Sequence, residues 1–345
     1  MTRTHIIAEM AWSHDGSPEL AAAITRAAAA AGADALSIHV THMPDYMVPH
    51  YGTGPGRVSA GKETRPIFDY LSDIALSFED WTNIARLARE VGLDLVVMPN
   101  DTASLRFAET LAPSAWVLSA ACFEEAEFIE EVGRLGRPVH LRVGGATLGE
   151  IDTVIGLLRG AGTADITLLY GHQNYPTAIE DTGLMLLAGL RDAFGLPVGL
   201  ADHIDASDDA AMVLPLLALP LGAVRIEKHI THDRAKRGED FESALDPAEF
   251  RLFVERVRKA ERALGSPLLT GLGGNSAAYR ANSRKRLVAA RDIAAGEVIL
   301  SGMLAAKRSD EGAPASDKPR LVGGRARVAI GKDRGVDLAS VTREG

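Results

Sequence analysis

Short apolar segments alternate with longer amphipathic segments through the first 265 residues, and this alternation restricts the possible folds more than any other feature of the chain. Apolar or β-branched runs predict strands at residues 6–8, 35–40, 94–98, 115–118, 139–142, 166–170, 198–201 and 224–228. Strands that alternate with helices pair in parallel, because each helix returns the chain to the same end of the sheet. Eight such units in about 250 residues predict a closed (β/α)8 barrel, the TIM barrel, rather than an open sheet.

The pattern changes after Gly265. Residues 267–283 are rich in glycine and serine and show no hydrophobic period, so we expect a linker there. Beyond the linker, short apolar stretches separated by glycine turns predict a small β-rich domain over residues 284–345. The barrel is therefore expected to occupy residues 1–266.

The composition argues against several classes of protein. The net charge is −9 and no basic stripe is present, so we expect no nucleic-acid partner. No apolar run reaches the roughly 18 residues that would cross a membrane, and the apolar stretch near the N-terminus is too short for a signal peptide. The single cysteine, Cys122, cannot form an intrachain disulfide and is typical of a reducing compartment. We therefore expect a cytoplasmic globular protein.

Histidines gather where the expected strands end, which is the face where TIM barrels place their catalytic residues. The six are His14, His39, His42, His172, His203 and His229. A lone histidine is usually structural, but imidazoles that converge on one rim are typical ligands of a divalent metal. Two-residue alternation also places Arg225, Glu227 and His229 on one face of the eighth strand, where Arg225 and Glu227 could instead form a structural ion pair.

Several stretches, in order and at matching intervals along nearly the whole chain, resemble the N-acetylneuraminate (sialic acid) synthase family. They read IIAEMAWSHDG, QNYPT, GLADH, EKHITHDR and LVAARDIAAGEVI. The resemblance implies a (β/α)8 barrel followed by a small antifreeze-like (SAF) domain. It also implies condensation of phosphoenolpyruvate, or a related three-carbon donor, with the open-chain aldehyde of an N-acyl sugar such as N-acetylmannosamine. The product would be a sialic-acid-like 2-keto acid.

The same resemblance implies a divalent metal and a homodimer in which the small domain of one chain covers the barrel of its partner. Mn²⁺ is the expected ion, with Mg²⁺, Co²⁺ or Zn²⁺ as alternatives. The metal ligands of the family fall on His203 and His229. Its acidic residue on the first strand falls on Glu9, and we take Glu227, which shares a strand face with His229, as a second catalytic carboxylate. The expected contacts to substrate are Gln173, Tyr175, Asp240 and, from the small domain of the partner, Arg308.

The chain departs from the family where phosphoenolpyruvate would bind. Two lysines of the family are replaced by Ser37 and Val117, a threonine by Met98, a serine by Ala120, a glutamate by Cys122 and a second serine by Arg142. These changes leave open an aldolase, a lyase or an isomerase that does not use phosphoenolpyruvate, and a non-catalytic binding protein. We expect Arg142, and less strongly Arg225, to take over anion binding, unless nearby acids neutralise them. Cys122 is either a new nucleophile or a small buried apolar side chain.

Overall fold

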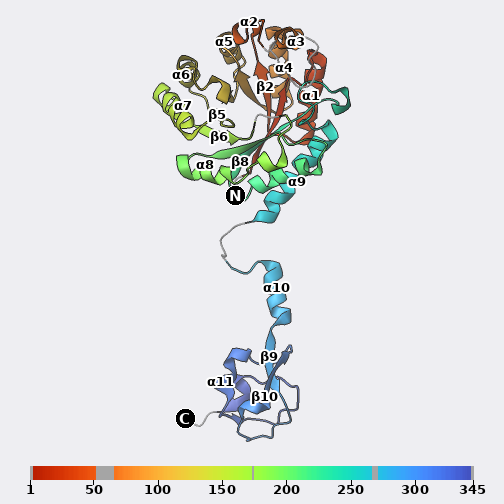
Figure 1. Ribbon diagram of the computed structural model, residues 1–345. Helices are drawn as coiled ribbons and strands as arrows, with labels where there is room; N and C mark the ends of the chain where they lie inside the picture. Colours follow the sequence, from red (N-terminus) through yellow and green to blue (C-terminus); the bar gives the residue numbers. More distant parts are fainter. Residues whose placement is uncertain (1–2, 52–65, 173–174, 266–270, 343–345) are drawn as a thin grey trace. The chain divides into compact units, whose positions relative to one another are not determined.

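The computed structural model describes residues 3–51, 66–172, 175–265 and 271–342. The chain divides into two compact units, residues 1–265 and residues 266–345 (Figure 1).

The first unit is a closed barrel of eight parallel strands in sequential order, which confirms the expected TIM barrel. The strands are β1 (His5–Ala11), β2 (Ala35–Val40), β3 (Asp94–Pro99), β4 (Ala115–Leu118), β5 (Val139–Arg142), β6 (Ile166–Tyr170), β7 (Val198–Asp202) and β8 (Ala223–His229). The barrel closes where β1 pairs with β8, in a register that places Glu9 opposite His229. Glycines permit the close approach of neighbouring strand ends, since a Cβ on Gly171 would lie only 1.8 Å from the carbonyl oxygen of Ala201.

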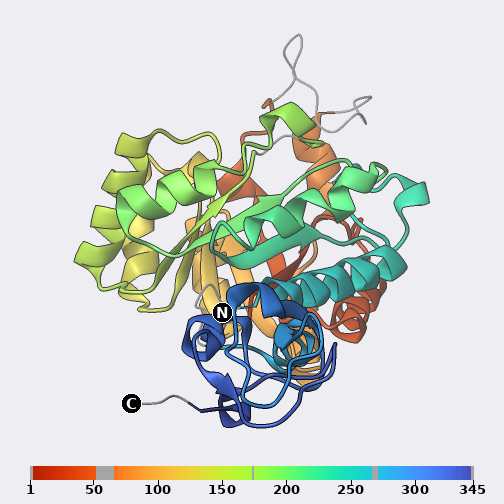
Figure 2. The same cartoon turned by 90° about the horizontal axis from the view of Figure 1, so that it is seen from below.

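Helices surround the strands. They are α1 (Pro18–Ala31), α2 (Met43–Tyr46), α3 (Ile67–Ile74), α4 (Phe78–Glu90), α5 (Thr102–Thr110), α6 (Ala126–Arg134), α7 (Leu148–Ala161), α8 (Leu186–Phe194) and α9 (Pro247–Leu264). The chain between β7 and β8 forms two 3₁₀ turns, Asp209–Met212 and Leu214–Ala218, in place of a longer helix. The first and last helices of the unit, α1 and α9, lie side by side and cover the junction of β1 and β8 (Figures 1 and 2).

The interior of the barrel contains an apolar cluster and, beside it, buried polar and charged side chains. Side chains of β1–β4 form a separate apolar cluster that consists of Ile7, Ala35, Val96, Met98, Ala115 and Val117. On β5, β6 and β8 the residues of the outer core alternate with side chains that point into the barrel. These inward side chains include His140, Arg142, Thr167, Arg225 and Glu227. Charged groups are rarely buried without a partner, so the buried charged side chains of the barrel indicate a functional site.

The second unit has its own small core, built on Leu287, Ile299, Leu321 and Val336 among others. Its elements are α10 (Gly274–Ser283), β9 (Lys285–Ala289), β10 (Leu304–Arg308), α11 (Lys318–Leu321), β11 (Arg325–Ala326) and β12 (Val341–Thr342). The expected linker is in part helical, because α10 occupies its last ten residues. No side chain of α10 is buried, so the sequence has no apolar stripe there that would have indicated a helix.

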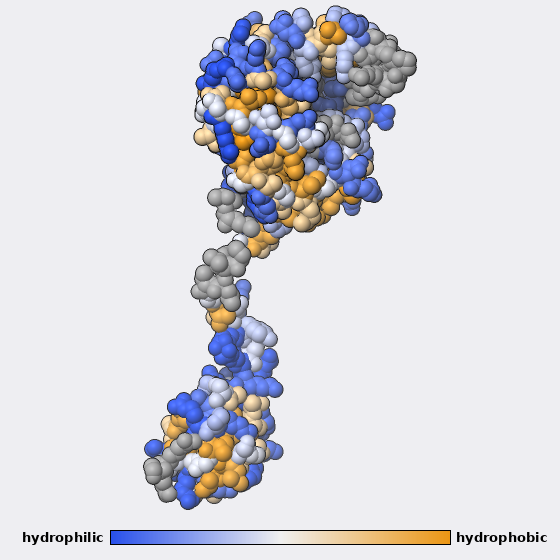
Figure 3. Space-filling view, turned by 60° about the vertical axis from the view of Figure 1, so that its left-hand side comes forward, coloured by the Kyte–Doolittle hydropathy of each residue, from blue (hydrophilic) through white to orange (hydrophobic). Residues whose placement is uncertain are grey.

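No helix among the described residues is long and apolar enough to span a membrane. In the space-filling view the visible surface of each unit mixes hydrophilic and hydrophobic side chains (Figure 3).

Candidate active site

A cavity of about 680 Å³ opens at the carboxyl ends of the barrel strands. It is lined by Trp12, His39, Asp45, Tyr46, Met98, Pro99, Asn100, Asp101, Thr102, Ser119, Ala121, Cys122, Glu125, Arg142, Tyr175 and Asp240. These residues belong to β2, β3 and β5 or to the loops and first helical turns that follow strands, which is where TIM barrels hold their active sites.

A buried ion cluster connects three strands beneath this cavity. The guanidinium of Arg142, on β5, contacts the carboxylate of Glu9 on β1, and its Nη2 lies 2.6 Å from Oε1 of Glu227 on β8. The three side chains are at most 2% exposed. The alternative in which acids neutralise Arg142 is therefore the arrangement observed. The guanidinium is shared by two carboxylates and is not a free fork for an anion.

The two carboxylates have opposite pKa shifts. Burial would raise the pKa of Glu9, but the charge of Arg142 and the neighbouring His39, whose Nε2 lies 3.3 Å from Glu9 Oε1, lower it below its usual range. Burial raises the pKa of Glu227, and the charge of Glu9 adds to this shift against the opposing effect of Arg142. Paired carboxylates whose environments separate their pKa values are typical of acid and base catalysis.

Next to this cluster, His203 and His229 form a buried pair of imidazoles. Their ring centroids are 5.1 Å apart, and none of their four ring nitrogens has a hydrogen-bond partner among the described residues. The backbone carbonyl of His203 accepts hydrogen bonds from Thr177 N and Ser243 Oγ, both at 2.8 Å. The carbonyl of His229 accepts one from Leu245 N at 3.0 Å. These hydrogen bonds fix the backbone of both histidines, from which the two rings project.

The histidine pair fits a divalent metal. Burial, with Arg142 nearby, lowers the pKa of His203 to about 3, and burial with His203 nearby lowers that of His229 well below its usual value. Both rings are therefore neutral, which is the form that binds metal. Buried nitrogens without partners are costly, and a coordinated ion would satisfy one on each ring. The Tyr175 ring, which lines the cavity, packs edge-on against both imidazoles, with its centroid 4.7 Å from that of His203 and 5.5 Å from that of His229.

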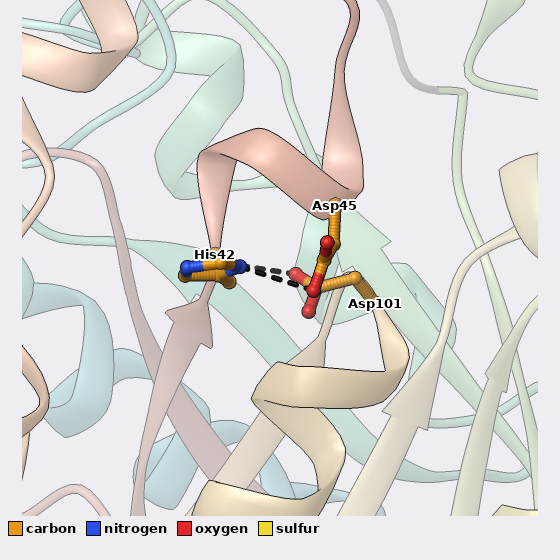
Figure 4. A group of neighbouring side chains, drawn as sticks. All are labelled: His42, Asp45 and Asp101. Atoms are coloured by element: carbon orange, nitrogen blue, oxygen red, sulfur yellow. Dashed lines mark hydrogen bonds and ion pairs between the residues drawn. The ribbon is translucent and has the colours of Figure 1, made fainter.

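A second group at the cavity could hold a cation. One ligand atom each of His42, Asp45 and Asp101 lie within 4.8 Å of one another, and Figure 4 shows the three side chains turned toward one another. These atoms already have hydrogen-bond partners. Asp101 caps α5 by accepting from Ser104 N at 2.8 Å, and it also accepts from His42 N at 2.8 Å, while His42 Nδ1 lies 3.1 Å from Asp45 Oδ2. The group therefore fits a metal less well than the unpartnered histidine pair does.

Asp240 reaches the cavity from the loop after β8, which is fastened to the loop after β1. Glu239 N donates to Asp15 Oδ1 at 3.0 Å, and a Cβ on Gly238 would lie only 2.0 Å from the Asp15 carboxylate, so a larger residue there would displace this side chain. Burial, together with the charges of Glu239 and Glu9, raises the pKa of Asp240 to about 8. At neutral pH its carboxyl group is therefore mostly protonated and can donate a hydrogen bond into the cavity.

We expect Asp240→Asn to change the pH dependence of stability. The folded chain binds the Asp240 proton more tightly than the unfolded chain does, so the stability from this proton is lost as pH rises from about 4 to about 8. Asparagine keeps the shape and suits the positive φ of 61° at this position. In urea unfolding, the free energy of unfolding of the variant relative to that of the wild type should therefore increase with pH over this range. The increase should be at most about 1.4 kcal/mol per pH unit. A difference that does not change with pH would contradict the assignment.

Cys122 lies at the cavity with the properties of a structural thiol. Burial and the nearby Glu125 raise the pKa of its thiol to about 12, and Sγ donates to the Ser119 carbonyl at 3.0 Å. Because the thiolate is the nucleophile, we expect alkylation by iodoacetamide at pH 7.5 to be about a hundredfold slower, or more, than for a free thiol. Mass spectrometry of the intact chain measures this rate, with the urea-unfolded chain as the control. Labelling as fast as in the unfolded chain would restore the nucleophile hypothesis.

Other predicted residues lie elsewhere. Gln173 is outside the described residues, and Arg308 is exposed at the end of β10 in the second unit. The alternative in which Arg225 and Glu227 form an ion pair is not the arrangement observed, since Glu227 contacts Arg142 and Arg225 Nη1 donates to Thr167 Oγ1 at 3.1 Å. Arg225 can cross the intervening β7 because its neighbour there is Gly199, which has no side chain.

The histidines of the rim divide into two kinds. His14 is structural, because its Nδ1 accepts from Gly16 N at 3.1 Å and its ring packs edge-on against Trp81. His39 lies beside Glu9 and lines the cavity, although no feature of the sequence distinguishes it from the other rim histidines. Trp12 and Asn100 also line the cavity, and their positions directly after β1 and β3 are the signal that could have indicated them.

Comparison with known proteins gives consistent results for both units. A family model described as NeuB family matches residues 24–268, and one described as SAF domain matches residues 284–341. The latter match confirms the expected antifreeze-like domain at the C-terminus.

Similar proteins include two synthases from Campylobacter jejuni. The N,N'-diacetyllegionaminic acid synthase is 26% identical over 94% of this chain and 96% of its own length. The pseudaminic acid synthase is 29% identical over 86% of this chain and 84% of its own. Among solved structures, the N-acetylneuraminic acid (sialic acid) synthetase of Leptospira borgpetersenii superposes with a TM-score of 0.70. It is 22% identical and covers 81% of this chain and 92% of its own, and at this identity the likeness concerns the fold alone.

Proposed function

The chain belongs to the NeuB family, and we propose that it catalyses a metal-dependent condensation of phosphoenolpyruvate, or a related three-carbon donor, with an N-acyl-sugar-like aldehyde. The product would be a sialic-acid-like 2-keto acid. The observation that carries the proposal is the placement, at one barrel mouth, of the Glu9–Arg142–Glu227 cluster beside the unpartnered pair of His203 and His229. The names of the similar synthases agree with it.

The two histidines would hold the metal, with Mn²⁺ as the first candidate. A divalent ion bound there would act as a Lewis acid toward the aldehyde oxygen. Glu9 and Glu227 would orient the substrate or water and exchange protons with it, while Arg142 fixes their positions. Tyr175 would keep water from the histidine pair, and Asp240 would donate a hydrogen bond to a substrate hydroxyl or carbonyl. Gln173 would be a further substrate contact.

One observation favours the alternative in which the enzyme is a metal-dependent aldolase, lyase or isomerase that does not use phosphoenolpyruvate. The barrel wall formed by β2–β4 is uncharged, with Ser37, Met98 and Val117 turned inward. A phosphate and a carboxylate on one small donor would need donors or cations from elsewhere.

The test is a mass-spectrometric assay of the purified full chain with Mn²⁺. Each of phosphoenolpyruvate and pyruvate is paired with N-acetylmannosamine and with related N-acyl amino sugars. A product with the combined carbon skeleton of donor and aldehyde supports condensation. Isomerised or cleaved substrate, without such a product, supports the alternative.

We also propose a homodimer in which the small domain of one chain covers the barrel of the other and brings Arg308 to its cavity. The opposite charges of the two segments support this, because residues 1–265 have a net charge of −15 and residues 266–345 have a net charge of +6. Complementary charges attract across an interface, and the attraction weakens with salt.

Light scattering at micromolar concentration is therefore expected to give twice the chain mass, falling toward the monomer at high salt. For Arg308, a mixture of Arg308→Ala with a cavity variant such as Asp240→Ala should regain activity, since mixed dimers contain one complete site. A monomer at low salt, or a mixture no more active than its parents, would contradict the arrangement.

A further inference from the structure

A buried ion pair joins the ends of the two strands that lead to the histidine pair. Asp202 is the last residue of β7, and Lys228 is the last but one of β8. The ammonium of Lys228 contacts the carboxylate of Asp202, and neither side chain is more than 1% exposed. Each residue of this ion pair directly precedes one of the two histidines, since His203 follows Asp202 and His229 follows Lys228.

The ion pair lies on the outer side of the barrel wall. Side chains of a strand alternate between its two faces, so Lys228, between the inward Glu227 and His229, points outward. On β7, Asp202 lies two residues beyond Leu200, which belongs to the outer core. Neither residue of the ion pair lines the cavity. Any role in the reaction would therefore have to act through the histidines.

Backbone pairing between β7 and β8 ends at this ion pair. The register places Asp202 opposite Lys228, and this is the last pair of residues in the ladder of the two strands. Beyond it, the carbonyls of His203 and His229 accept hydrogen bonds from other loops of the barrel. The ion pair is therefore the last link between the two strands before the histidines.

Stability alone does not explain why two charges are buried here. Removing an ammonium and a carboxylate from water is costly, and apolar side chains of similar volume often stabilise a protein as well or better. Buried polar groups are best known for fixing the register of neighbouring segments. Apolar side chains can pack at several offsets, whereas one ammonium and one carboxylate meet at a single offset of the two strands.

We propose that Asp202 and Lys228 are positioning residues, which hold His203 and His229 at the separation at which both rings can bind one metal ion. This inference rests on the proposed metal site and adds to it two residues outside the cavity. The ring centroids of the histidines are 5.1 Å apart. Because metal–ligand distances must lie within about 0.2 Å of their preferred value, a small slip of β7 along β8 would withdraw one of the two ligands.

The double variant Asp202→Leu with Lys228→Met replaces both charges with apolar side chains. It should melt at or above the temperature of the wild type, since no unpaired charge remains in the outer core. Its dissociation constant for Mn²⁺, measured on the full chain by equilibrium dialysis, should rise by about 10- to 100-fold, as is usual when a group that orients metal ligands is lost. Lys228→Met with Asp202→Asn changes the shape less and should show the same loss of affinity.

Ile226→Ala is the matched control. Ile226 is fully buried, lies on β8 two residues before Lys228 and belongs to the same outer core. Its truncation should lower the melting temperature, because it leaves a cavity, but it should keep the wild-type affinity for Mn²⁺ because the ion pair remains. Wild-type affinity in the double variant, or an equal loss of affinity in Ile226→Ala, would overturn the inference.

Chemical modification of the metal-free chain separates this outcome from that of the proposed metal site. Diethyl pyrocarbonate acylates accessible neutral imidazoles, and peptide mass spectrometry gives the rate at each histidine. His203 and His229 should react faster in the double variant than in the wild type, while the rate should not change at His14, which packs against Trp81. If the wild type binds no Mn²⁺, the proposed metal site fails, and these rates still decide whether the ion pair positions the histidines. Equal rates in the two chains would then overturn the inference.

Discussion

Arg142→Met is expected to lower the free energy of unfolding by about 3–5 kcal/mol, because it leaves the buried carboxylates of Glu9 and Glu227 without their cation. Each kcal/mol lowers the melting temperature of a large domain by about 2–4 °C, so the barrel should melt roughly 10 °C lower. Differential scanning calorimetry measures this directly.

Two variants make the interpretation specific. Arg142→Met combined with Glu9→Gln and Glu227→Gln should recover much of the lost stability, since no buried charge then remains unpaired. Arg106→Met removes an exposed ion pair to Glu131 and should change stability by less than about 1 kcal/mol. Wild-type stability of Arg142→Met together with a loss of substrate affinity would show instead that Arg142 binds substrate.

Replacing both His203 and His229 with alanine is expected to abolish metal binding. In the wild type, each buried ring offers nitrogens that have no partner among the described residues, and alanine offers no ligand. Elemental analysis after dialysis against Mn²⁺ should fall from about one ion per chain, the stoichiometry of a single site, to less than a tenth of that. Activity should fall with it.

The group formed by His42, Asp45 and Asp101 provides the matched control. His42→Ala combined with Asp45→Ala should keep the ion, because those donors are engaged in hydrogen bonds. The opposite result, with metal lost from this variant and kept in the double histidine variant, would place the metal at the group drawn in Figure 4.

The barrel could be predicted because each strand corresponds to a short apolar run that is recognisable in the local sequence. All eight strands begin within one residue of their predicted start: six begin at it, and β1 and β8 begin one residue earlier, at His5 and Ala223. Helix α10 could not be predicted, because its exposed side chains form no stripe. Helix propensity without burial is a weak signal, and the glycines and serines around α10 favoured the prediction of a linker.

The site was only partly accessible from the sequence. Alternation placed Arg225, Glu227 and His229 on one face, but it cannot say which residues of other strands they meet. Glu9 and Arg142 are 133 residues apart, and their contact depends on closure of the whole barrel. Arg225 can reach Thr167 because Gly199, on the strand between them, has no side chain. Such a contact depends on the tertiary structure and not on the local sequence.

Cys122 illustrates the same limit. Its place after the fourth strand left open either a nucleophile or a small apolar side chain, and only the environment of the thiol decides between them. Burial and Glu125 raise the pKa of its thiol, and no sequence pattern reports the depth of a side chain at a cavity wall.

The central claim is that this chain forms a carbon–carbon bond between a three-carbon donor and a sugar-like aldehyde. It is tested most directly by carbon NMR of a reaction in which the donor is labelled with carbon-13 at C3 and the aldehyde at C1. Pyruvate and phosphoenolpyruvate are supplied in separate reactions with Mn²⁺. The account predicts a new pair of signals split by coupling between the two labelled carbons, which the chain with His203 and His229 replaced does not produce. The absence of that coupling from both reactions, with donor or aldehyde consumed, would contradict it.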